Sequence, residues 1–302
     1  MNFPSAPDQG SKTLAERLAH HVDVLAGLIG PRSLAQPKAL AATATRIENE
    51  LSRSGYSVQR QSFSADGATV DNLIAEVRGS AEPETIVVLG AHYDSTPMTP
   101  GADDNASAVA VLLEAARLFR AVAPRRTVRF VAFACEEAPH YHTDEMGSVV
   151  YARSCRARHE HILGMLCLEM VGYYTTARGS QQVPPGIPRW LRGFFPKRGD
   201  FLAAVGNLRS WRVAWRFRRG FKRAVRFPLF SICLPERIEE IRRSDNSSFW
   251  DQGYPALMLT DTSFLRNPHY HRASDLPDTL DYERMAAVTL GVVGAVRRLS
   301  GG

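Results

Sequence analysis

The chain has 302 residues, of which 44% are hydrophobic, and a formal net charge of +6. This length and composition exclude an intrinsically disordered protein and predict a single domain over residues 1–302. No stretch approaches the roughly 18 apolar residues of a transmembrane helix, and residues 1–12 lack the basic and apolar segments of a secretory signal.

The hydrophobic pattern predicts helices that alternate with strands. In the first part of the chain, helical spacing covers residues 13–29, 39–54 and 105–118, and strands are expected at 56–63, 72–77 and 85–90. Further along, strands are expected at 127–134, 162–168 and 256–260, and helices at 145–158 and 282–299. This alternation indicates an α/β fold, a three-layer sandwich in which helices flank a mixed, mainly parallel sheet.

The alternation stops between residues 172 and 244, where proline, glycine, aromatic and arginine residues are frequent. We interpret this segment as an inserted cap or specificity region over the edge of the sheet or its site. Residues 201–235 contain eight basic residues and no acidic ones, which exceeds the net charge of the whole chain. The basicity therefore belongs to one segment.

Six arginines within this segment recur at intervals of three and four and so share one helix face: Arg209, Arg212, Arg216, Arg219, Arg223 and Arg226. Trp211, Trp215 and Phe221 are expected on another face. An acidic peptide, a nucleic acid or an anionic membrane surface would suit the 209–226 basic face. The alternative is a solvated cationic face without a partner.

The four cysteines, Cys135, Cys155, Cys167 and Cys233, form no C-x-x-C pair. Two of them lie in apolar runs, where a small buried side chain is the ordinary interpretation. We therefore expect reduced thiols and a cytoplasmic protein.

Acidic and histidine residues follow four of the predicted strands. They are His92 and Asp94 after 85–90, Glu136 and Glu137 after 127–134, Glu169 after 162–168, and His271, preceded by Tyr270, in the loop beyond 256–260. Asp104 lies between strand 85–90 and the next helix. In an open α/β sheet such positions meet at one edge, where so many carboxylates would repel one another without cations. Imidazole and carboxylate ligands suit zinc, cobalt or manganese in an open catalytic site.

Each of these short motifs, taken alone, is usual for a solvated loop; their succession at consecutive strand ends is not. Together, G-A-H-Y-D-S (90–95), P-G-A-D-D-N-A-S (100–107), C-E-E (135–137), L-E-M (168–170) and P-H-Y-H (268–271) resemble the co-catalytic di-zinc aminopeptidases, the metallopeptidases that include bacterial leucyl aminopeptidases and the glutamate carboxypeptidase type. The resemblance spans roughly residues 72–280.

The resemblance implies two zinc ions bridged by Asp104, with His92 and Glu169 completing one site and Glu137 and His271 the other. It also implies a cis peptide bond between Asp104 and Asn105. The expected reaction is hydrolysis of N-terminal peptide bonds of a peptide or aminoacyl substrate by a water that two zinc ions activate.

Three further residues beside these ligands are expected to take part in catalysis. Glu136 is the expected general base, Asp94 is expected to orient His92, and Tyr270 is a candidate donor to the developing oxyanion. His140 and His142 either border the cleft or lie in a surface loop. His269 is close to His271 in sequence, but the Tyr-His context favours His271.

Three departures from the family pattern stand out, one of which is that segment 172–244 contains no motif that matches the family. Glu169 replaces the usual aspartate, and Ser244-Asp245-Asn246 replaces a frequent Ser-Asp-His. The alternatives are a single-zinc glutaminyl cyclase or a carboxypeptidase on the same fold, and a non-catalytic binding scaffold. The completeness of the ligand set argues against the cyclase and the scaffold.

Overall fold

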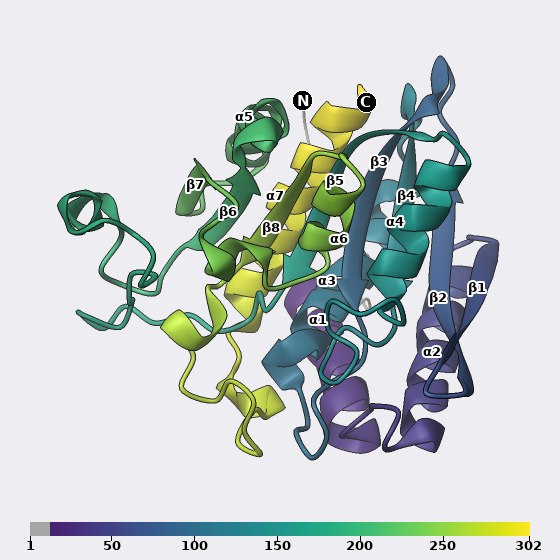
Figure 1. Cartoon of the computed structure of the whole chain (residues 1–302), viewed down its shortest axis with the longest axis horizontal. Coiled ribbons are helices and arrows are strands. Elements are labelled where there is room, and N and C mark those ends of the chain that lie inside the picture. The colour runs from purple at the N-terminus through teal and green to yellow at the C-terminus, as the bar shows by residue number, and fades with distance from the viewer. Residues whose placement is uncertain (1–12) are drawn as a thin grey trace.

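A computed structural model describes residues 13–302 (Figure 1). The prediction about a secretory signal concerns residues 1–12 and lies outside the described residues. Within residues 13–302, no helix has the combination of length and apolarity that a bilayer crossing requires.

An eight-stranded mixed sheet forms the middle layer, with the order β1-β2-β4-β3-β5-β8-β6-β7. Its strands are β1 (Val58–Ala65), β2 (Ala68–Val77), β3 (Glu82–His92), β4 (Arg126–Phe133), β5 (His161–Glu169), β6 (Leu202–Asn207), β7 (Leu229–Leu234) and β8 (Ala256–Thr260). The four central strands β4, β3, β5 and β8 are parallel, whereas β1, β2 and β6 pair antiparallel with their neighbours on the central side. The predicted fold class is confirmed.

Helices cover both faces of the sheet (Figure 1). The α-helices are α1 (Leu14–Val22), α2 (Pro37–Arg53), α3 (Ala108–Phe119), α4 (Gly147–Ala157), α5 (Trp211–Ala224), α6 (Asn246–Asp251) and α7 (Tyr282–Ser300). Short helices are η1 (Asp23–Ile29), η2 (Ala102–Ser107), η3 (Arg189–Phe194), η4 (Leu208–Ser210), η5 (Glu239–Arg242), η6 (Ser263–Leu265) and η7 (Pro277–Thr279). One hydrophobic core lies under α1, α2, α3, α5 and α7, and a second lies under α4 and α6.

Local sequence explains where several elements begin. Thr13 and Glu16 form a capping box at the start of α1, and Asp281 caps α7 by accepting a hydrogen bond from the backbone of Arg284. Pro37 is the first residue of α2, where its missing N–H costs nothing. The run 86–92 of β3 is buried throughout, as a strand covered on both faces requires.

Segment 172–244 contributes strands β6 and β7, which extend the sheet beyond β8, and helix α5, which connects them. The sequence pattern did not predict β6 or β7. Phe221 is buried, but Trp211 and Trp215 are exposed together with the arginines of α5. The prediction of a separate aromatic face is therefore wrong for the two tryptophans, because their positions on the helix border the cationic stripe rather than the packed side.

Candidate metal centre

The carboxyl ends of four parallel strands meet at one edge of the sheet. β3 ends at His92 and β5 ends at Glu169. Glu136 and Glu137 follow β4, and the loop after β8 carries His271. Because these strands are neighbours and run in the same direction, the topology brings the predicted residues to a single edge.

Three buried side chains form the first candidate group for a metal ion. Nε2 of His92 lies 3.3 Å from Oε2 of Glu169 and 3.5 Å from Oδ1 of Asp104. Two ligands of a tetrahedral zinc at about 2.0–2.1 Å are themselves separated by roughly 3.3 Å. The spacing of the three side chains therefore suits one ion.

A second group shares Asp104 with the first. Nε2 of His271 lies 3.1 Å from Oδ2 of Asp104 and 3.5 Å from Oε2 of Glu137. Asp104 thus faces the two histidines with different oxygens of one carboxylate. This geometry allows Asp104 to bridge two ions.

Buried polar atoms without partners test whether cations fit here. Among the described residues, both ring nitrogens of His92, Oδ1 of Asp104 and Oε1 of Glu137 are buried and accept or donate no hydrogen bond. Unpaired buried polar atoms are costly, so native structures retain few of them. Imidazole and carboxylate atoms left free in this way fit divalent ions such as zinc, cobalt or manganese.

The charges at this edge of the sheet also favour the binding of cations. Burial raises the pKa of Glu136 well above its ordinary value, and although His92 opposes this, Glu137 and Glu169 add to the rise. Burial and the charge of Asp104 raise the pKa of Glu137 to about 7. Burial lowers the pKa of His92, but Glu136 and Glu169 outweigh it and leave that pKa well above normal. The cluster therefore lacks positive charge.

Glu136 belongs to neither group but lies beside the first, with Oε2 3.8 Å from Nε2 of His92. Asp94 accepts hydrogen bonds of 3.1 and 3.0 Å from the backbone N–H groups of Glu136 and Glu137. Oδ1 of Asp94 is also 3.6 Å from Nδ1 of His92. Asp94 therefore fixes the loop after β4 and lies close to the ring that it was predicted to orient.

The loop that carries Asp104 is held by residues that the sequence analysis missed. Asp275 accepts hydrogen bonds from the backbone N–H groups of Asp103 and Asp104, at 2.9 and 3.1 Å. The buried guanidinium of Arg32 donates to the backbone oxygens of Tyr93, Pro100 and Gly101. The peptide bond between Asp104 and Asn105 is cis, as the resemblance implies. One indication of Asp275 was present in the sequence, an acidic residue four positions after His271. There was no such indication of Arg32.

Ser244 and Asp245, within the run that departs from the family pattern, also support the edge. The hydroxyl of Ser244 donates a 2.6 Å hydrogen bond to Oε2 of Glu169. Asp245 is fully buried, which raises its pKa to about 7, and both its carboxylate oxygens are without a hydrogen-bond partner among the described residues. Asn246 donates instead to the backbone oxygen of Ile241.

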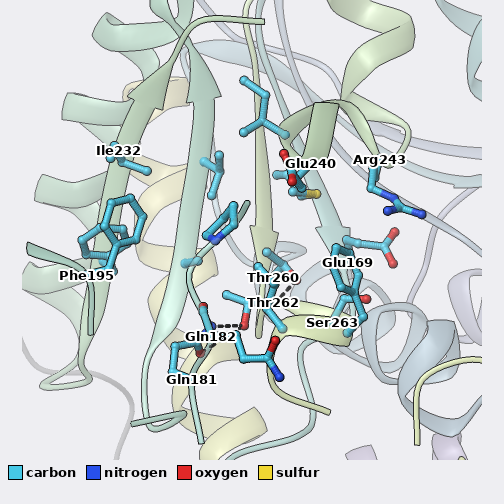
Figure 2. Close-up of a pocket in the computed structure, with 18 of the residues that line it drawn as sticks. Glu169, Gln181, Gln182, Phe195, Ile232, Glu240, Arg243, Thr260, Thr262 and Ser263 are labelled. Carbon is cyan, nitrogen blue, oxygen red and sulfur yellow. Dashed lines mark hydrogen bonds between the residues drawn. The ribbon is translucent and has the colours of Figure 1, made fainter. Parts of the chain in front are cut away.

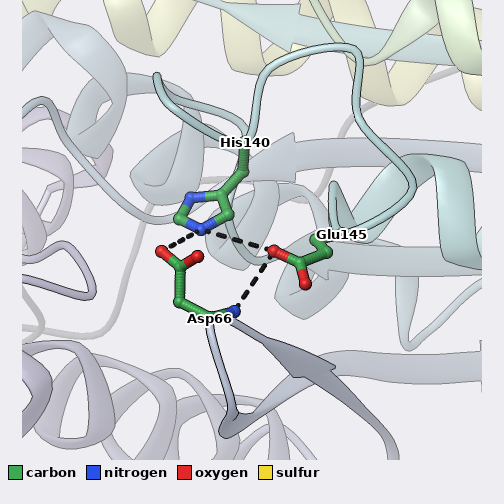
Figure 3. Close-up of side chains that lie close together, drawn as sticks. All are labelled: Asp66, His140 and Glu145. Carbon is green, nitrogen blue, oxygen red and sulfur yellow. Dashed lines mark hydrogen bonds and ion pairs between the residues drawn. The ribbon is translucent and has the colours of Figure 1, made fainter.

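His140 ties the loop after β4 to the turn between β1 and β2 (Figure 3). Its Nε2 lies 2.9 Å from Oδ2 of Asp66 and 3.9 Å from Oε2 of Glu145. The backbone N–H of Asp66 donates to Glu145 at 3.2 Å. Because the backbone N–H of His140 also donates to the carbonyl of Glu137, this latch helps to position Glu137.

The other histidines lie apart from both groups. His142 is exposed, stacks on Tyr141, and its Nε2 is 3.0 Å from the hydroxyl of Ser247. The surface-loop interpretation therefore suits His142, whereas His140 is buried. His269 pairs with Ser274 at 3.0 Å and belongs to neither candidate group.

An apolar pocket adjoins the metal-binding edge (Figure 2). It contains about 820 Å³ of empty space, partly open to solvent, and its walls include Phe195, Phe230, Ile232 and residues of β8. Glu169 belongs both to the lining and to the first metal group. The pocket therefore opens directly beside that group.

Tyr270 also lines the pocket, and its ring stacks on His271 with centroids 3.8 Å apart. Burial raises the pKa of Tyr270, and the carboxylates of Asp104 and Glu137 raise it further. Its phenol therefore keeps its proton at neutral pH and can act as a hydrogen-bond donor.

Comparisons with known proteins agree with this geometry. The model of peptidase family M28 matches residues 72–296, which include every candidate metal ligand. The chain is 37% identical over 299 residues to uncharacterized protein YfbL of Escherichia coli K12, covering 96% of this chain and 89% of that protein. A probable zinc metalloprotease of Leptosphaeria maculans is 28% identical over 210 residues; the match covers 64% of this chain and 46% of the fungal protein.

Solved structures share the fold at low sequence identity. BSAP, a zinc aminopeptidase of Bacillus subtilis, superposes with a TM-score of 0.71 at 17% identity, covering 94% of this chain and 96% of that chain. A glutaminyl cyclase of Fimbriiglobus ruber superposes with a TM-score of 0.68 at 20% identity, covering 98% and 99%.

Proposed function

The chain belongs to peptidase family M28, and on that premise we propose that it is an aminopeptidase that binds two zinc ions. His92, Asp104 and Glu169 would hold one ion, and Asp104, Glu137 and His271 would hold the other. The observation that supports this proposal is the pair of groups sharing Asp104, each with buried atoms that lack a hydrogen-bond partner in the described chain. Cobalt or manganese suits the same donors.

Two bound divalent ions would polarise the substrate carbonyl and lower the pKa of the attacking water. Glu136 accepts a proton from that water and passes it to the leaving amine, a role for which its place beside the first group, with Oε2 3.8 Å from Nε2 of His92, suits it. The Tyr270 hydroxyl donates to the developing oxyanion. Asp94 keeps Glu136 in place through its backbone N–H.

A glutaminyl cyclase is the second candidate, because its fold superposes almost as well as that of the aminopeptidase, with TM-scores of 0.68 and 0.71. A cyclase with one zinc ion has no need of a second complete ligand group. Glu137 and His271 therefore favour the peptidase.

The test is a panel of aminoacyl anilides, N-blocked peptides and peptides with N-terminal glutamine, combined with the metal content per chain. We expect two zinc ions per chain, turnover of substrates with a free N-terminus, and none of blocked peptides. One zinc ion per chain with cyclisation of glutamine peptides overturns the proposal.

Glu136→Ala tests the base separately. It should lower kcat by about 10²- to 10⁴-fold with the metal content unchanged. Glu84→Ala is the matched control, since Glu84 is an exposed glutamate near the start of β3, whereas His92 lies at the end of that strand. Equal activity of the two variants removes Glu136 from the mechanism.

A further inference from the structure

The outward side of α5 and of the residues just before it carries dense positive charge. We call the exposed residues of segment 208–226 the α5 face. Its basic residues, eight in number with the half-buried Arg216, are the only charged side chains between Asp200 and Glu236. α5 lies at the rim of the molecule beside β6 and β7 (Figure 1).

The opposite side of α5 already has its packing partner, α7. A Cβ atom added to Gly220 would lie 2.6 Å from Cα of Ala295, so the two backbones touch there. Phe217 and Phe221 are fully buried on this side. The helix is therefore anchored without any contribution from the α5 face.

The cations of the α5 face are not neutralised within the described chain. None of the eight basic residues forms an ion pair or side-chain hydrogen bond with residues 13–302. Elsewhere arginines are paired, as Arg129 is with Glu76 and Glu160. Glu236, the first acidic residue after the α5 face, pairs with Arg242 and accepts a hydrogen bond from Asn207 instead. Mutual repulsion within the face makes an anionic partner favourable.

The α5 face also exposes large apolar side chains among the cations. Leu208 is 59% exposed, Trp211 56% and Trp215 49%. The guanidinium of Arg212 lies 5.2 Å from the Trp211 ring, and that of Arg219 lies 4.8 Å from the Trp215 ring. The phosphate backbone of a duplex nucleic acid is bound mainly through charge. Exposed tryptophan and leucine within a cationic helix face are typical of contact with a membrane interface.

The position of α5 leaves the metal centre accessible. β6 runs antiparallel to β8, so its carboxyl end lies at the sheet edge opposite the one with the metal groups. η4 and α5 follow β6 directly. The N-terminal end of α5 therefore lies toward the sheet edge away from His92 and His271.

We propose that the α5 face docks this protein on the surface of an anionic phospholipid bilayer. The helix lies in the plane of the bilayer, with Trp211 and Trp215 at the headgroup level and the arginines and lysine against lipid phosphates. The contact is peripheral, it is independent of the proposed peptidase activity, and it weakens as salt screens the charges.

Sedimentation with vesicles tests the electrostatic part. The full chain should bind vesicles of phosphatidylglycerol and phosphatidylcholine, and not vesicles of phosphatidylcholine alone. Arg212→Gln/Arg219→Gln/Arg223→Gln should reduce partitioning by about fivefold for each charge, or roughly a hundredfold together. Lys38→Gln/Arg53→Gln/Arg156→Gln removes three exposed cations outside the α5 face and should bind like the parent.

The fluorescence of the tryptophans distinguishes binding to a bilayer from binding to a nucleic acid. Parent protein should show a blue shift of tryptophan emission with anionic vesicles, and Trp211→Ala/Trp215→Ala should lose the shift and bind less. Trp190→Ala, which removes an exposed tryptophan on η3, is the matched control and should behave like the parent.

Circular dichroism and metal content establish that each variant is folded. Two results overturn the proposal. The first is no binding of the parent to phosphatidylglycerol vesicles at low salt. The second is tighter binding to duplex DNA or RNA than to these vesicles at the same salt, with no loss of either in Trp211→Ala/Trp215→Ala.

Discussion

The hydroxyl of Ser244 donates a 2.6 Å hydrogen bond to Oε2 of Glu169. This is the same oxygen that lies 3.3 Å from Nε2 of His92. A hydrogen bond to one oxygen fixes the rotation of a carboxylate, so Ser244 determines how Glu169 faces the first metal group.

Ser244→Ala should therefore weaken one metal site without removing any ligand. We expect about 10- to 100-fold lower affinity for one of two ions, measured by competition with a chelator of known affinity. Ser248→Ala is the control, because its buried hydroxyl pairs with Ser148 rather than Glu169. Equal metal affinity in both variants would show that Glu169 needs no such support.

Replacement of two nearby histidines should have opposite outcomes. His271→Ala removes the imidazole of the second group and should lower the metal content from two ions to one, with loss of hydrolysis. His269→Ala removes a histidine that is bonded to Ser274 and should retain both ions. Metal analysis after dialysis decides, and the assignment fails if His269→Ala loses the ion instead.

The latch between His140 and Asp66 should contribute to stability. His140→Ala leaves the loop after β4 without its 2.9 Å contact to Asp66, and we expect the free energy of unfolding in urea to fall by about 1–2 kcal/mol. His142→Ala, at an exposed position, should change it by less than about 0.5 kcal/mol. Comparable losses in the two variants would argue that the latch contributes nothing.

The buried carboxylate of Glu114 should make stability depend on acid pH. Burial raises its pKa, but hydrogen bonds from His21, Arg17 and Arg117 outweigh this and lower the pKa from 4.5 to about 2. The folded-state pKa is depressed, so the stabilisation is fully present above the unfolded value near 4.5 and is lost as pH falls towards 2. Its size is roughly 3 kcal/mol.

Urea unfolding of metal-free protein at pH 7 and pH 3 measures this effect. Glu114→Gln should be less stable than the parent at pH 7, and the difference should narrow at pH 3. Glu84→Gln, an exposed carboxylate, should follow the parent at both values. A gap between Glu114→Gln and the parent that is the same at both pH values contradicts the assignment.

The central part of the fold was predictable because its strands are continuous apolar runs. The predicted range 256–260 coincides with β8, and 127–134 differs from β4 by one residue at each end. Candidate ligands were visible because they directly follow such runs. β6 and β7 escaped prediction because they lie in the segment where the alternation of helices and strands stops, and the residues of β7 are all half-buried, which gives no alternation of buried and exposed positions to detect.

The residues that support the site were not predictable from local pattern. Each of them acts through a hydrogen bond to a residue that is distant in the sequence. Ser244 lies 75 positions from its partner Glu169, Asp275 lies 172 positions from Asp103, and Arg32 lies 61 positions from Tyr93. Their partners are determined by the tertiary structure alone. Helical spacing placed Arg212, Arg216, Arg219 and Arg223 correctly on α5, whereas Arg209 lies in η4 and Arg226 lies beyond the end of α5. The spacing also could not determine that Trp211 and Trp215 would remain exposed.

The two metal groups are completed at different stages of synthesis. Every side chain of the first group lies at or before Glu169, whereas the second waits for His271, near the end of the chain. A ribosome that stalls between these two positions leaves a chain with half of its centre. On the proposed function, a chain that holds both ions would therefore be one that has been translated through its last strand.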